Sequence, residues 1–126
     1  MVIIEDYVSF EVAKLLKEKG FDWECVYFYD YYEENDKYVV CSTGGSCNRE
    51  YCPSEYSMPT LQMAMKWLRE VYNIDIFPWK IGKGIYSCAI FNSNTGQDLS
   101  SDKDFPSEKY EEAAEAAIQY SLKNLI

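Results

Sequence analysis

The five cysteines are the residues of this chain with the widest range of chemistry, because thiolates act as metal ligands and as nucleophiles. They stand at Cys25, Cys41, Cys47, Cys52 and Cys88. A structural zinc site would need four of them to converge, since the chain has no histidine to complete a mixed site. Four residues separate Cys47 from Cys52, whereas a common zinc knuckle has two. We therefore predict free thiols, no metal site and no catalytic cysteine.

Acidic side chains are the second group with chemical potential. Residues 98–115 carry seven carboxylates against two lysines. Paired carboxylates bind metals or act as acid and base. Several of these, however, lie at the expected start of a helix, where the helix dipole favours negative charge. We interpret the cluster as solvated surface, with the alternative that it mimics nucleic acid and occupies a basic groove of another protein.

Two further features bear on whether the chain could be an enzyme. They are its glycine segments and its lack of histidine. Without histidine the chain lacks the commonest general base and the usual partner of a nucleophile. Ser42–Ser46 can form a backbone nest for an anion but lacks the lysine and spacing of a phosphate-binding loop. Gly82–Gly84 lies where a hairpin turn is required. We predict turns at both segments, no cofactor and no enzymatic activity.

Size and charge limit the partners. A chain of 126 residues has the size of one domain, so we predict a single domain over residues 1–126. Its net charge of −9 repels phosphate backbones, and we expect no direct binding to nucleic acid. The longest apolar run, Cys25–Tyr29, is too short for a membrane span, and the acidic start is unlike a secretory signal. These features predict a cytoplasmic protein with no membrane partner.

Three segments have helical spacing. The first is predicted between an N-cap at Ser9 and a C-terminal Gly20, and the second begins around Ser57 to Thr60. The third follows Pro106–Ser107, with Ser107 as its cap. Its apolar stripe comprises Tyr110, Ala113, Ala114, Ala117, Ile118, Ser121, Leu122 and Leu125.

Two strand pairs lie between these helices. Cys25–Tyr29 is predicted to pair with Lys37–Thr43, joined by a polar turn at residues 30–36; a turn centred on Glu33 would place Cys25 opposite Cys41. Ile74–Trp79 is predicted to pair with Ile85–Asn92. The order is therefore α-β-β-α-β-β-α. It indicates an α+β protein in which a mainly antiparallel sheet packs with three helices.

Aromatic residues occur on both faces of these strands. In an antiparallel sheet with one solvent-exposed face, apolar and polar residues are instead expected to alternate along each strand. Either helices cover both faces, or one face is a binding surface, for which tyrosine and tryptophan are well suited. The candidate binding residues are Tyr27, Tyr29, Tyr38, Trp79 and Tyr86.

Three blocks, Tyr7–Phe21, Pro59–Ile74 and Tyr110–Ile126, resemble a group of small uncharacterised proteins of gut-bacterial phages and mobile elements. The blocks coincide with the three expected helices. The resemblance implies an accessory protein in the cytoplasm of a bacterial host, with a role in host takeover or counter-defence. It identifies no active site.

These observations predict a non-catalytic protein that acts by protein–protein interaction. We expect it to associate with itself through aromatic sheet surface and to engage a host protein. The alternative is a protein that binds and sequesters a small molecule or nucleotide under its aromatic face or its Gly44–Tyr56 loop.

Overall fold

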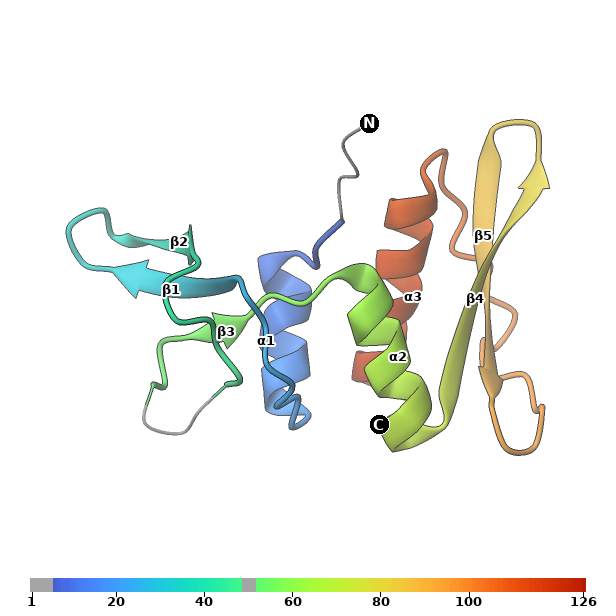
Figure 1. Ribbon diagram of the computed structural model, residues 1–126. Coiled ribbons are helices and arrows are strands. Elements are labelled where there is room, and N and C mark those ends of the chain that lie inside the picture. Colours follow the sequence, from blue (N-terminus) through green and yellow to red (C-terminus); the bar gives the residue numbers. More distant parts are fainter. Residues whose placement is uncertain (1–5, 49–51) are drawn as a thin grey trace. The chain divides into compact units, whose positions relative to one another are not determined.

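The computed structural model describes residues 6–48 and 52–126, which fall into two compact units, Met1–Thr60 and Leu61–Ile126 (Figure 1). The elements are α1 (Phe10–Glu18), β1 (Phe28–Tyr32), β2 (Lys37–Cys41), β3 (Tyr56–Ser57), α2 (Leu61–Tyr72), β4 (Ile74–Gly82), β5 (Ile85–Asn92) and α3 (Tyr110–Asn124). Both sheets are antiparallel, with the orders β2-β1-β3 and β4-β5. The predicted α+β class and the order of the helices and long strands are confirmed, and the short β3 is an addition. That residues 1–126 form one domain stays a prediction.

Helix α1 has the two caps that its sequence predicts. The Ser9 hydroxyl accepts a hydrogen bond from the Val12 N–H at 3.3 Å. At the other end Gly20 takes φ +94°, and the Phe21 N–H donates to the Leu16 carbonyl at 2.9 Å. This glycine-based cap satisfies carbonyls that the last turn leaves without helical partners. The boundaries of the helix therefore follow from local sequence.

The first hairpin is shifted from the predicted register. Phe28 pairs with Cys41, while Cys25 pairs with Ser46, so the expected opposition of Cys25 and Cys41 is wrong. The turn is shorter than expected because Asp36 takes φ +49°, a conformation that aspartate tolerates. Residues 30–32, which we expected in the turn, are therefore part of β1.

The loop after β2 makes a close approach to Cys25. The Cys25 N–H donates to the Ser46 carbonyl at 2.7 Å, and the Ser46 N–H donates to the Cys25 carbonyl at 2.8 Å. Gly45 has φ +65°, and a Cβ built on it would lie 2.6 Å from the Cys25 carbonyl oxygen. Gly44 has φ +78° but open space at the Cβ position. Glycine at 45 is thus required by both backbone conformation and contact.

In the second unit both helices lie on the same side of the β4–β5 sheet (Figure 1). The strand residues on that side are buried beneath them: Ile74, Ile76, Cys88 and Ile90. Six of the eight stripe positions predicted for α3 are buried: Ala113, Ala114, Ala117, Ile118, Ser121 and Leu122. Small residues let the helix backbone approach the sheet closely, while the larger ones supply apolar area.

The start of α2 agrees with the prediction to within one residue, whereas that of α3 is corrected. Helix α2 begins at Leu61 because the preceding residues pair elsewhere: the Met58 N–H donates to the Tyr27 carbonyl at 3.0 Å. Helix α3 begins at Tyr110, and Ser107 is not its cap. Ser107 instead forms an antiparallel bridge with Tyr86, accepting from its N–H at 2.7 Å. At α3 backbone pairing thus replaces the predicted cap.

The segment after β5 follows the outer edge of that strand. The Leu99 N–H donates to the Ile90 carbonyl at 2.7 Å, and the Cys88 N–H donates to the Asp104 carbonyl at 3.1 Å. Because Cys88 bonds outward, Pro78, its partner on β4, also turns its backbone away from the β4–β5 ladder. The missing N–H of Pro78 therefore costs this ladder no hydrogen bond.

None of the helices in the described part of the chain has the length and hydropathy that a bilayer span requires.

Candidate binding surfaces

Tyr29 and Tyr38, two of the predicted binding residues, meet around Phe10 of α1. The Phe10 ring centroid lies 5.3 Å from that of Tyr29 and 4.5 Å from that of Tyr38. Tyr56 of β3 completes the cluster, with its centroid 5.4 Å from Phe10. The Tyr29 hydroxyl donates to the Val8 carbonyl at 3.1 Å. These contacts attach α1 to the first sheet, so the rings serve packing there.

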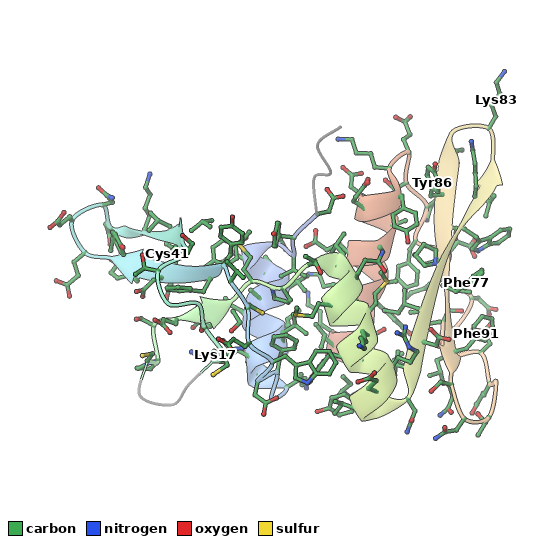
Figure 2. The ribbon with its side chains drawn as sticks, in the orientation of Figure 1. Lys17, Cys41, Phe77, Lys83, Tyr86 and Phe91 are labelled. Carbon is green, nitrogen blue, oxygen red and sulfur yellow. The ribbon has the colours of Figure 1, made fainter. Side chains whose placement is uncertain are left out.

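Lys17 is a residue that sequence reasoning missed in this cluster (Figure 2). Its ammonium donates to the carbonyls of Pro53 at 2.9 Å and Glu55 at 2.5 Å, and it lies 4.5 Å from the Tyr56 ring centroid. Burial lowers the pKa of Lys17, while the nearby Glu55 carboxylate acts in the opposite direction. The lysine therefore holds the segment before β3 against α1.

Tyr27 lies apart from these rings. Its centroid is 5.3 Å from that of Tyr7, in an edge-to-face arrangement. The first unit thus separates its three predicted binding residues into two groups.

Trp79 and Tyr86, the predicted residues of the second unit, lie on opposite faces of the β4–β5 sheet. Tyr86 turns toward α3, where its ring centroid is 5.9 Å from that of Tyr110 (Figure 2). Trp79 pairs with Ser87, and strand alternation places both on the face away from the helices. Ser87 is covered by the Asp104 carbonyl, which accepts a hydrogen bond from its hydroxyl. Trp79 remains accessible.

The face away from the helices carries large apolar side chains, and we call it the open face. It bears Phe77, Trp79, Ile85 and Phe91, and Figure 2 shows Phe77 and Phe91 directed away from α2 and α3. Phe77 is 60% exposed, Trp79 48% and Ile85 42%. Ile81 lies beside them in a β-bulge and is 43% exposed. Alternation in β4 was the signal that would have added Phe77 to the prediction.

Charged side chains lie at the two ends of the open face. The pairing register places Asp75 and Asp98 on either side of Phe91, at the base of the hairpin. Asp75 forms an ion pair with Arg69 at 3.9 Å, with both side chains partly exposed. Lys83 lies at the hairpin tip (Figure 2). The face is therefore acidic at its base, apolar along its length and basic at its tip.

The thiols provide no reactive centre among the buried residues. Burial raises the pKa of Cys25 to about 11 and that of Cys88 to about 12. Both are therefore protonated at neutral pH, and a thiol is a poor nucleophile and metal ligand in that form. The five cysteines all lie in the described residues, and none of them forms a disulfide. Within residues 6–48 and 52–126 no group of three metal-ligating side chains lies close enough to hold an ion.

No protein-family model, curated protein or solved structure matches this chain.

Proposed function

We propose that the protein is a non-catalytic interaction protein that binds another protein chain through the open face of its β4–β5 sheet. The placement of both helices on one side of a two-stranded sheet supports this most directly. It leaves Phe77, Trp79 and Ile85 on the other side with much of their surface in water.

The chemistry of this face favours a protein partner. Tryptophan and phenylalanine are enriched at protein interfaces, where they bury much area and lose little side-chain entropy. Burial of apolar surface yields roughly 25 cal/mol per Å², so covering these side chains is favourable. Charged residues lie at the ends of the face, as in an interface with an apolar centre and a polar rim. The role in host takeover or counter-defence rests on the sequence resemblance and is part of this proposal.

Site-specific photo-crosslinking tests the binding face. A photoreactive phenylalanine analogue replaces Phe77, and the matched control carries it at Val71, which is 50% exposed on α2. We expect irradiation in the cells that contain the protein to give a discrete adduct from position 77 and none from position 71. Adducts to a second copy or to another protein both support the proposal. Failure to form an adduct at 77, or the same adducts from both positions, would overturn it.

A small-molecule site is the second candidate, and a hollow in the first unit favours it. The hollow has a volume of about 440 Å³, within the range of ligand pockets, and is lined by Glu24, Cys25, Val26, Ser42, Gly44 and Gly45. The Glu24 carboxylate opposes binding of a phosphate, so we infer a neutral or cationic ligand. Amide NMR shifts of Gly44 and Gly45 during titration with small amines and nucleosides test this. Absence of shifts at millimolar ligand would exclude it.

A further inference from the structure

We propose that the chain covering the open face is a second copy of this protein, stacked with the hairpin tip of each copy over the hairpin base of the other. The inference rests on the proposed function, whose binding face it supplies with an occupant and an orientation.

The first argument is self-complementarity. In a twofold-symmetric interface the same patch of each copy is in contact. A residue on one side of the symmetry axis therefore contacts a residue of the other copy that lies at the same distance on the opposite side. Asp75 lies near the start of β4 and Lys83 just beyond its end, after the β-bulge at residues 80–82, so the two charges lie on opposite sides of Trp79. A twofold axis beside Trp79 and across the strands would stack the two indole rings. It would also place each acidic base against a basic tip.

Charge decides between the two ways of stacking this face on itself. With the axis along the strands, the acidic base of one copy would lie over the acidic base of the other, and the two Lys83 tips would lie together. Like charges placed opposite one another oppose association. Hydrogen bonds from Ser100 lower the pKa of Asp98, so this carboxylate is ionised at neutral pH. The tip-over-base arrangement replaces these repulsions with attractions.

The available area sets the strength of the dimer. The four large exposed side chains, Phe77, Trp79, Ile81 and Ile85, together expose about 400 Å². A standard interface buries about 800 Å² on each partner, and about half of that is available here, so the area is that of a weak, transient contact. We therefore expect a weak dimer, with a dissociation constant of about 10 µM or higher.

Sedimentation equilibrium with charge-reversed variants tests both the partner and the orientation. We expect Lys83→Glu and Asp75→Lys each to weaken dimerisation about tenfold, because each converts two attractions per dimer into repulsions. The double variant should dimerise more tightly than either single variant, because it restores opposite charges at positions 75 and 83 while Asp98 and Arg69 keep theirs. Lys123→Glu, on α3, changes the net charge as Lys83→Glu does and should leave dimerisation unchanged.

A second variant addresses the apolar centre. Trp79→Ser should weaken dimerisation by tenfold or more, with far-UV circular dichroism unchanged because the side chain is half exposed. A monomer at several hundred micromolar would overturn the second copy as partner. A dimer unaffected by Lys83→Glu would overturn the tip-over-base orientation. If the protein is monomeric but position 77 still gives an adduct with another protein, the proposed function stands and this inference fails.

Discussion

A pair of alanine substitutions in the Ser42–Ser46 turn separates backbone strain from steric contact. Gly44 and Gly45 both have positive φ, so alanine at either position incurs the left-handed cost of about 1 kcal/mol. At 45 the new Cβ would also meet the Cys25 carbonyl oxygen at 2.6 Å, whereas at 44 it would meet no atom within 4 Å. Relieving that contact must separate Cys25 from Ser46 and weaken their two hydrogen bonds, each contributing about 1 kcal/mol. We expect Gly44→Ala to lower the free energy of unfolding by about 1 kcal/mol and Gly45→Ala by about 3 kcal/mol.

Native-state hydrogen exchange measures this difference where it arises. The Cys25 and Ser46 amides, each bonded across the contact, should lose far more protection in Gly45→Ala than in Gly44→Ala. Urea unfolding followed by far-UV circular dichroism gives the corresponding global values. If the two variants differ by less than about 0.5 kcal/mol, within the usual error of additivity, the turn does not approach Cys25 as described and the reasoning is refuted.

The remaining predictions concern the core and the thiols. Ala117→Leu should overpack the contact between α3 and the sheet and lower the free energy of unfolding by about 1–3 kcal/mol. Glu112→Gln, on the exposed side, should lower it by at most about 1 kcal/mol; equal urea midpoints would show that the packing face is wrongly assigned. Stopped-flow titration with a thiol reagent should give three rapid thiols and two slow ones, Cys25 and Cys88, because the latter are buried. Unfolding free energies should fall as the pH rises above 9, since both thiols release protons near 9 when unfolded but near 11 and 12 when folded. Cys88→Ala should flatten that decline, and an unchanged slope would contradict the assignment.

The helices were predictable because their signals are local. The spacing of Ala113, Ala117 and Leu122 identifies the packed face of α3 without knowledge of its partner. Ser9 and Gly20 likewise mark the ends of α1 through conformations that suit those residue types. Signals of this kind can be recognised in a single sequence, without knowledge of the tertiary contacts.

Sheet register and the choice of face were less predictable. Tyr31 and Tyr32 follow a polar residue in sequence, and alternation alone does not indicate that the turn begins after them. In the second unit both faces of β5 carry apolar residues, so the pattern does not specify the side that α2 and α3 cover. Trp79 and Tyr86 were both predicted as binding residues, yet Tyr86 contacts Tyr110 of α3 while Trp79 lies on the opposite face. Tertiary packing distinguishes them.

The backbone at the two edges of the β4–β5 sheet has a consequence for polymerisation. A bare strand edge is a template on which further chains can add without limit, as in amyloid fibrils. Here the outer edge of β5 already bonds to residues 97–107, and Pro78 interrupts the outer edge of β4 with a position that has no N–H. Fibril growth by strand addition is thus opposed at both edges. The protein can therefore present Phe77 and Trp79 to water without offering either edge of this sheet for strand addition.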